Sequence, residues 1–276
     1  MKQKKNICFV TDAGPKKFLG YGHLFRCIKI AKFLEGEYNV YFNTKSKISK
    51  QIIQEKKLKY TSKGVFDFIL CDLPNSNNEK FKKVYSKKII IIDEFNNYKK
   101  KAYKIFNSIK IQKFLFLKFA NTITRQSKAI KRKKIKYFVS FGGNDYYNLS
   151  KKMFFYFQKN KIKNFKFARY FNKKSYIPKN QTLMNYDKIF TNYKVLFFIG
   201  SGGNTMFEML SNNIPCLIIP TNEIEKKYVN YLKKKYKIDL FKFNVDLKEQ
   251  FDIINSKKKI KLNINEIKKK YKTLFK

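Results

Sequence analysis

The chain has 276 residues, a formal net charge of +44 and 43% hydrophobic residues. Its 29 phenylalanines and 19 tyrosines exclude a disordered polyelectrolyte, and its length suits one large domain or two smaller ones. No apolar run approaches the roughly 18 residues that a membrane span needs, and the apolar stretch near the N-terminus is too short for a signal peptide. We therefore expect a cytoplasmic protein.

The positive charge is spread along the whole chain rather than gathered in one stripe or tail. A nucleic-acid-binding surface should be clustered, so we attribute most of the excess lysine to coding bias and expect no nucleic-acid partner. A positive field would still attract an anionic small substrate, such as a nucleotide sugar.

The four cysteines lie far apart, without a CxxC pair, and a single histidine accompanies them. A zinc site needs clustered ligands, so we expect neither a metal site nor a cofactor. Cys8, Cys71 and Cys216 fall within apolar runs, and we expect them to be buried small hydrophobes.

The first half alternates predicted strands with predicted helices. Short apolar runs indicate strands at residues 6–12, 38–44, 67–73 and 87–95. Amphipathic spacing indicates helices at residues 24–34 and 46–58. Continuous apolar strands are typical of a parallel sheet that is covered on both faces. Residues 99–136 are basic and poor in strand signal, so we place a domain boundary near their end.

The second half repeats this alternation. Its predicted strands lie at residues 135–141, 165–171, 194–200 and 214–220. Its predicted helices lie at residues 149–160, 204–212, 223–236 and 263–276. The pattern predicts an α/β fold of two Rossmann-like domains, residues 1–133 and 134–276, whose parallel sheets face a central cleft. Such sheets bind ligands at the carboxyl ends of their strands.

A glycine-rich turn, GSGGNT, joins a predicted strand to a predicted helix in the second domain. Glycine lets the backbone approach a ligand closely, and a helix N-terminus favours phosphate. We expect this helix to begin near Asn204 or Thr205, with Glu208 in its first turn. A carboxylate there either accepts hydrogen bonds from a ribose diol or complements the helix dipole, and the local sequence leaves both roles open.

A second glycine turn, FGGND, ends at Asp145, which either belongs to another ligand-binding turn or caps the next helix. Asp72 and Asp93 end predicted strands of the first domain. Most such aspartates are turn or cap residues, so we assign neither to the site.

The only histidine, His23, follows the glycine turn of the first domain and precedes a predicted helix. A lone histidine is usually a structural residue, but this position places it at the ligand-binding end of the sheet. The positive end of a helix dipole favours a neutral imidazole, which can act as a base. Arg26 lies one turn further along and can hold an anionic or hydroxyl-rich ligand.

The segment GYGHLFRCIKIA resembles the GxGHxxRCxxLA motif of the UDP-sugar hydrolases of pseudaminic acid biosynthesis. Those enzymes act on UDP-2,4-diacetamido-2,4,6-trideoxy-β-L-altropyranose. The resemblance continues, in the family's order and spacing, in DFILCD, IIIIDEF, FVSFGGND, FIGSGGNTMFEML and IPCLIIP. The glycine-and-Glu element is shared with GT-B glycosyltransferases, including the N-acetylglucosaminyltransferase that makes lipid II, so it identifies the fold more than the reaction.

The resemblance implies a GT-B fold whose C-terminal domain binds UDP. Gly202, Gly203, Asn204 and Thr205 would contact the diphosphate, and Glu208 would contact the ribose. The helix N-terminus and basic groups would neutralise the leaving diphosphate without a metal ion.

The resemblance also implies the reaction. His23 would act as general base on a water that attacks the anomeric carbon and expels UDP with inversion. The other residues expected to bind substrate are Asp12, Gly20, Gly22, Arg26, Gly142, Gly143, Asn144, Asp145, Ser201 and Asn222.

The sequence departs from the family at two points that matter here. Val10 stands where the family usually has an arginine, and Asn222-Glu223 replaces its Asn-Gln pair. These changes leave the exact sugar open.

Three functions are therefore compared. In the hydrolase His23 activates water, whereas in a GT-B glycosyltransferase it would deprotonate an acceptor hydroxyl. An acceptor surface in contact with a membrane is left open. A nucleic-acid binder would leave the glycine turns and His23 unexplained. The hydrolase is the expected function, acting as a monomer on a UDP-sugar.

Overall fold

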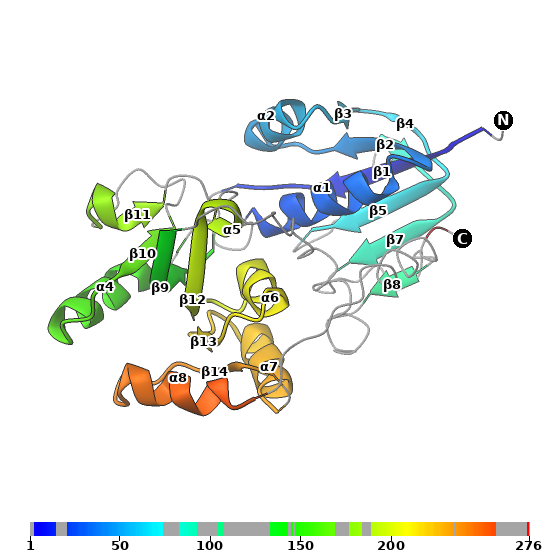
Figure 1. The fold of residues 1–276 in the computed structure, drawn as a ribbon. Coiled ribbons are helices and arrows are strands. Elements are labelled where there is room, and N and C mark those ends of the chain that lie inside the picture. Colours follow the sequence, from blue (N-terminus) through cyan, green and yellow to red (C-terminus); the bar gives the residue numbers. More distant parts are fainter. Residues whose placement is uncertain are drawn as a thin grey trace. The chain divides into compact units, whose positions relative to one another are not determined.

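The computed structural model describes residues 3–14, 21–73, 83–92, 104–106, 133–142, 145, 147–168, 177–183, 189–234, 236–257 and 275. The chain forms two compact units (Figure 1). Unit 1 comprises Met1–Asn121 with Asn263–Lys276, and unit 2 comprises Thr122–Leu262.

Unit 1 is built on a six-stranded sheet in the order β3-β2-β1-β5-β7-β8, and its paired strands are parallel. The strands are β1 (Lys5–Thr11), β2 (Tyr38–Asn43), β3 (Lys59–Tyr60), β5 (Phe68–Asp72), β7 (Ile89–Ile92) and β8 (Lys104–Phe106). The helices are α1 (Gly22–Leu34) and α2 (Lys47–Glu55). A two-stranded parallel sheet joins β4 (Gly64–Val65) to β6 (Val84–Tyr85).

Unit 2 has a second six-stranded sheet in the order β11-β10-β9-β12-β13-β14, again with parallel pairing. The strands are β9 (Lys133–Ser140), β10 (Phe165–Ala168), β11 (Thr182–Leu183), β12 (Tyr193–Gly200), β13 (Cys216–Ile218) and β14 (Ile238–Leu240). The helices are α4 (Leu149–Lys159), α5 (Ile189–Asn192), α6 (Asn204–Ser211), α7 (Glu223–Leu232) and α8 (Leu247–Asn255), with a 3-10 turn at Lys179–Gln181.

The two sheets have the same topology. When the strands of each sheet are renumbered along the chain, both orders read 3-2-1-4-5-6, which is the order of the doubly wound Rossmann fold. The order reverses between β1 and β5 in unit 1, and between β9 and β12 in unit 2. Ligands of such sheets bind at these switch points, beyond the carboxyl ends of the strands. Each unit therefore has one expected ligand-binding edge.

Burial explains why these segments form central strands. Ile7, Cys8, Phe9 and Val10 are consecutive and all buried, so β1 is covered on both faces. The four cysteines are fully buried free thiols, as the apolar surroundings of three of them predicted. In unit 2, helices α4 and α8 contribute to a core with many aromatic rings on the same sheet.

The C-terminal end of the chain belongs to unit 1. Phe275 is buried there, with its ring 5.5 Å from that of Phe68 and 5.7 Å from that of Tyr38. The sequence-based boundaries assigned residues 134–276 to one domain, because no local pattern shows that the chain returns to its first unit. Apart from Phe275, the predicted helix at 263–276 lies outside the described residues.

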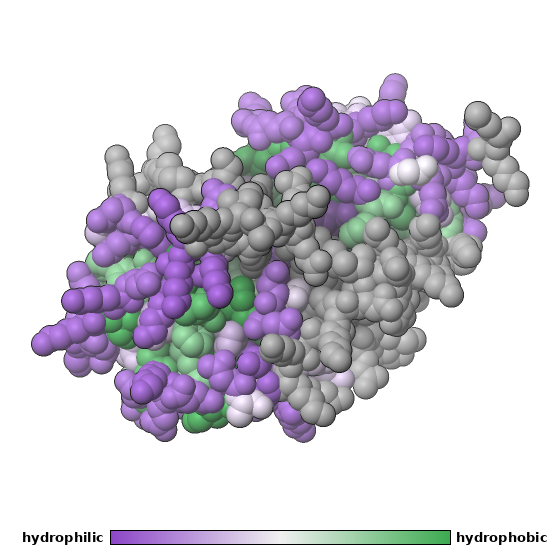
Figure 2. Space-filling model, viewed as in Figure 1, coloured by the Kyte–Doolittle hydropathy of each residue, from purple (hydrophilic) through white to green (hydrophobic). Residues whose placement is uncertain are grey.

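The visible surface is mainly hydrophilic wherever it is described. Figure 2 shows hydrophilic residues spread over both units in this view, with small separate hydrophobic patches. Among the described helices, none combines the length and apolarity that a membrane crossing requires.

Candidate functional site

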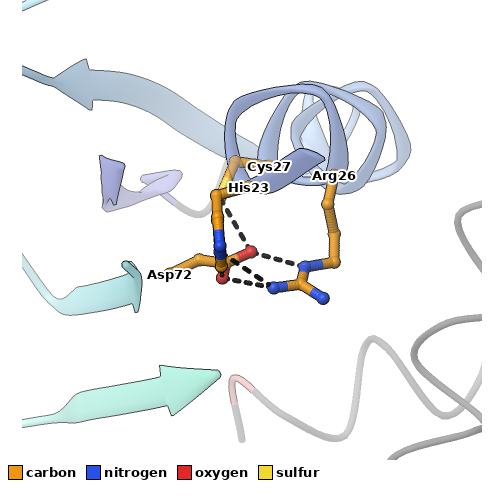
Figure 3. A network of polar contacts seen from close by, with 4 residues as sticks. All are labelled: His23, Arg26, Cys27 and Asp72. Atoms are coloured by element: carbon orange, nitrogen blue, oxygen red, sulfur yellow. Dashed lines mark hydrogen bonds and ion pairs between the residues drawn. The ribbon is translucent and has the colours of Figure 1, made fainter. Parts of the chain in front are cut away.

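A buried polar cluster lies at the switch point of unit 1 (Figure 3). Asp72 is the last residue of β5, and its carboxylate faces the first turns of α1. Asp72 Oδ1 lies 2.8 Å from His23 Nδ1, and Asp72 Oδ2 lies 2.5 Å from Arg26 Nε. Arg26 Nη2 donates a second bond to Oδ1, so the arginine binds the carboxylate in a bidentate manner. Cys27 Sγ lies 3.7 Å from Oδ2.

The helix spacing accounts for this convergence. His23, Arg26 and Cys27 stand at positions i, i+3 and i+4 of α1, so their side chains share one face of the helix. That face lies over the end of β5, because α1 packs on β1 and β5.

The contact with Asp72 fixes the tautomer of His23. A carboxylate accepts hydrogen bonds and cannot donate one, so a 2.8 Å contact requires the hydrogen on Nδ1. Arg26 Nη2 also lies 3.3 Å from Nδ1, but a donor facing an N–H adds no bond there. In the neutral ring the lone pair is then on Nε2, the atom that can accept a proton.

The charges of the cluster keep Asp72 ionised. Burial by itself would raise the pKa of its carboxyl, but the charges of Arg26 and His23 and the hydrogen bonds from both hold that pKa well below its usual range. Asp72 is fully buried, whereas the His23 side chain keeps 18% of its surface exposed. The cluster therefore contains a partly exposed imidazole that is hydrogen-bonded to an ionised, buried carboxylate.

The structure adds information on two residues considered from sequence. Arg26 was expected to hold a ligand, and its side chain is 1% exposed and pairs with Asp72, so it positions that carboxylate. Asp72 had been set aside as a turn or cap residue, yet it is the partner of His23. The available signal was its place at the end of the strand beside β1, where the sheet order reverses.

Asp12 follows β1 directly, and one oxygen of its carboxylate is bonded within the protein. It is 7% exposed, and Oδ1 accepts bonds from Thr44 Oγ1 at 2.7 Å and Ser49 Oγ at 3.0 Å. The same oxygen accepts from the backbone N–H groups of Ala13 and Ser46. Asp12 therefore connects β1 to the end of β2 and the start of α2, a structural role that the sequence had not indicated.

Replacing Asp12 with alanine should lower the free energy of unfolding by about 3 kcal/mol, because several buried donors lose their acceptor. Urea denaturation measures this change. Asp67→Ala is the matched control, since Asp67 accepts an exposed bond from the backbone N–H of Asn6 and should cost less than about 1 kcal/mol. Equal effects of the two substitutions would contradict the structural role of Asp12.

In unit 2 two glycine turns meet at the switch point. Gly142 follows β9 with a φ of 84°, a left-handed conformation that glycine adopts readily. Ser201 follows β12, and its backbone N–H donates to the carbonyl of Ser140 at 3.1 Å. The predicted turns are therefore adjacent. Gly20, Gly143 and Asn144 lie outside the described residues, and Gly22 is the first residue of α1.

Helix α6 begins at Asn204, as predicted, with Gly203 at its N-cap and Thr205 next in its first turn. Glu208 is the fifth residue of α6, so it lies beyond the first turn where the sequence had placed it. It is 5% exposed. A dipole effect fades within the first turn, so this correction removes the dipole explanation for Glu208.

Two other predicted ligand residues cap helices. Asp145 accepts bonds at 2.9 Å from the backbone N–H groups of Leu149 and Ser150, so it caps α4. Burial raises the pKa of Asp145, although these bonds oppose the rise. Asn222 is the N-cap of α7, and its Oδ1 accepts from the backbone N–H of Glu225 at 2.9 Å.

Glu225 is a residue that the sequence reasoning missed. Its Oε2 accepts bonds from the backbone N–H of Gly202 at 3.1 Å and of Thr221 at 2.7 Å. It therefore links the turn before α6 to the turn before α7. A glutamate in the first turn of a predicted helix looks like an ordinary helix residue, and no local signal shows the contact across to another turn.

The described residues contain no group of three or more histidine, cysteine, aspartate or glutamate side chains placed to hold a metal ion. No family model matches the sequence, and no curated protein matches it.

Solved structures do resemble this chain. The glycosyltransferase of kitacinnamycin aligns with 99% of this chain and 95% of its own, with a TM-score of 0.51 and 8% identity. Spinosyn forosaminyltransferase SpnP gives a TM-score of 0.56 with 8% identity, over 98% and 95% of the two chains. The glycosyltransferase SnogD from Streptomyces nogalater gives 0.54 with 9% identity, over 99% and 95%.

At such low identity these likenesses concern the fold alone. They agree with the two parallel sheets of identical strand order. The chain has the GT-B fold, with two Rossmann-like domains, as the sequence predicted.

Proposed function

We propose that this protein is a glycosyltransferase that uses a UDP-sugar donor, with His23 as the general base. The observation that carries the proposal is the contact of His23 Nδ1 with the buried Asp72 carboxylate at the switch point of unit 1. An imidazole held in this way is a standard arrangement for accepting a proton from a nucleophile. The three similar structures, described as a glycotransferase, a forosaminyltransferase and a glycosyltransferase, share the GT-B fold, and a glycosyl-transfer reaction is consistent with that fold.

The proposed chemical step moves one proton and exchanges one bond. Nε2 of His23 accepts the proton of an acceptor hydroxyl while its oxygen attacks the anomeric carbon of the donor. The bond between that carbon and the diphosphate oxygen breaks, and UDP leaves with the electron pair. Attack from the face opposite the leaving group inverts the anomeric centre. Asp72 stabilises the imidazolium that forms, as a carboxylate does in other base-assisted sites.

The donor is assigned to unit 2. Gly203, Asn204 and Thr205 begin helix α6, where backbone N–H groups and the helix dipole favour a diphosphate. Ser201, in the adjoining turn, belongs to the same set. Glu208 remains the proposed partner of the ribose diol. The high positive charge of the chain supports an anionic donor.

A UDP-sugar hydrolase is the second candidate, and the segment GYGHLFRCIKIA favours it. Water would then replace the acceptor hydroxyl, with the same base and leaving group. The sugar would be a diacetamido-trideoxy sugar of pseudaminic acid biosynthesis or a related amino sugar.

The test is UDP release from a panel of UDP-linked acetamido sugars, first without an acceptor and then with a set of hydroxyl acceptors. Release that requires an acceptor, with a glycosylated product, supports the transferase. Release of UDP and free sugar in water supports the hydrolase instead. A protein that neither binds UDP nor releases it under any of these conditions would contradict both.

A further inference from the structure

The turn proposed to hold the diphosphate already has a protein carboxylate bonded to it. Glu225 Oε2 lies 3.1 Å from the backbone nitrogen of Gly202, which precedes the N-cap of α6 by one residue. The same oxygen accepts from the backbone N–H and the hydroxyl of Thr221, at 2.7 Å and 3.0 Å. One anionic oxygen therefore has three donors from two different turns.

Helix capping explains only part of this arrangement. Glu225 is the third residue of α7, where a glutamate commonly reaches back to the backbone N–H groups at the helix start. The usual donor in that motif is the N-cap N–H, here that of Asn222, and the two bonds from Thr221 come from the residue just before it, so they are a near variant of the motif. The motif does not account for the bond from Gly202, which lies 23 residues earlier on another turn.

The packing shows that the Gly202 contact is built into the fold. A Cβ atom at position 202 would lie 2.7 Å from Glu225 Cβ and 3.2 Å from its Cα. A side chain at 202 would therefore collide with α7 itself, which cannot move aside cheaply. Gly202 and Glu225 are matched to each other, and the carboxylate is held against the turn.

We propose that the negative charge of Glu225 weakens the binding of UDP by the turn before α6 and so promotes product release. The proposal rests on the function proposed above, in which this turn binds the diphosphate. A phosphate held by the next backbone N–H groups would lie within about 10 Å of the carboxylate, since each residue spans at most about 3.6 Å. Charges at that separation still interact across the Debye length.

The repulsion acts more strongly on the product than on the donor. The terminal phosphate of free UDP has a second ionisation near pH 6, so at pH 8 UDP carries about one more negative charge than a UDP-sugar. A fixed carboxylate beside the turn therefore disfavours UDP most. The backbone N–H of Gly202 already donates to Glu225, so it does not donate to the diphosphate.

The experiment is isothermal titration of UDP and of uridine into the full-length wild type and the variant Glu225→Gln at pH 8. The glutamine oxygen can still accept from Gly202 and Thr221, while the charge is removed. We expect UDP to bind about tenfold more tightly to Glu225→Gln, with uridine, which has no phosphate, unchanged within twofold. The gain should shrink in high salt.

Glu223→Gln is the matched control. Glu223 lies in the same first turn of α7, but its side chain is 78% exposed and pairs with Lys226. Its charge is screened by water, so the affinity for UDP should change less than about twofold.

Glu225→Ala guards against a folding artefact, because it also removes the charge while Asn222 still caps α7. A damaged protein loses affinity rather than gaining it, so tighter binding by both variants supports the proposal. Unchanged or weaker UDP binding by Glu225→Gln overturns it, provided that the wild type binds UDP. If the wild type does not bind UDP, the proposed function itself fails.

Discussion

Replacing His23 with alanine should lower the rate of UDP release by about a thousandfold, the scale on which a positioned general base contributes. Without Nε2 the nucleophile must lose its proton to water during attack. UDP should still bind with nearly wild-type affinity, because His23 is not among the residues proposed to hold it. Steady-state turnover and isothermal titration with UDP measure the two quantities separately.

His23→Asn makes this experiment sharper than alanine alone. The asparagine amide can replace Nδ1–H as a donor to Asp72, so the buried carboxylate keeps a partner. The variant has no equivalent of Nε2, however. Loss of turnover in His23→Asn with an unchanged melting temperature would identify the missing base as the cause. Turnover within tenfold of the wild type in either variant would remove His23 from that role.

The fold was predictable from sequence because each central strand can be identified from its own run of apolar residues. The runs around Phe9 and Phe138 are apolar without alternation, which is how strands buried on both faces of a parallel sheet appear. The order of strands within each sheet was not predicted, because right-handed connections are compatible with several orders. The return of Phe275 to unit 1 was not predictable, because it depends on a contact between distant parts of the chain.

For the candidate site, the sequence predicted the positions of residues that glycine and histidine mark. His23 and the start of α6 at Asn204 were placed correctly. The roles of the carboxylates were less well predicted. An aspartate or glutamate at the end of a helix or strand has the same local sequence whether it binds a ligand, caps a helix or orients another side chain. The roles inferred for Asp72 and Glu225 depend on hydrogen-bond partners that lie 49 and 23 residues away in the sequence. Asp12 was expected to bind substrate, and the structure adds bonds from Thr44 and Ser49 to its carboxylate that no local pattern indicates.

The contact between Asp72 and His23 predicts that Asp72 is also needed for turnover. Asp72→Asn should reduce turnover by about a thousandfold, since a neutral amide cannot stabilise the imidazolium and no longer enforces the hydrogen on Nδ1. The substitution should also destabilise the fold by about 3 to 5 kcal/mol, because it removes the charge that compensates the buried Arg26. A single variant therefore mixes a catalytic effect with a structural one.

A double variant separates the two effects. Arg26→Met removes the buried cation while keeping much of the side-chain volume, and a buried ion pair can often be replaced by neutral groups without loss of stability. In the variant carrying both Asp72→Asn and Arg26→Met, urea denaturation should show most of the stability restored. Turnover should remain low, because the imidazole still lacks its carboxylate. If turnover instead recovers together with stability, Asp72 serves the fold and not the base. Recovery of stability alone would show that the carboxylate acts through His23.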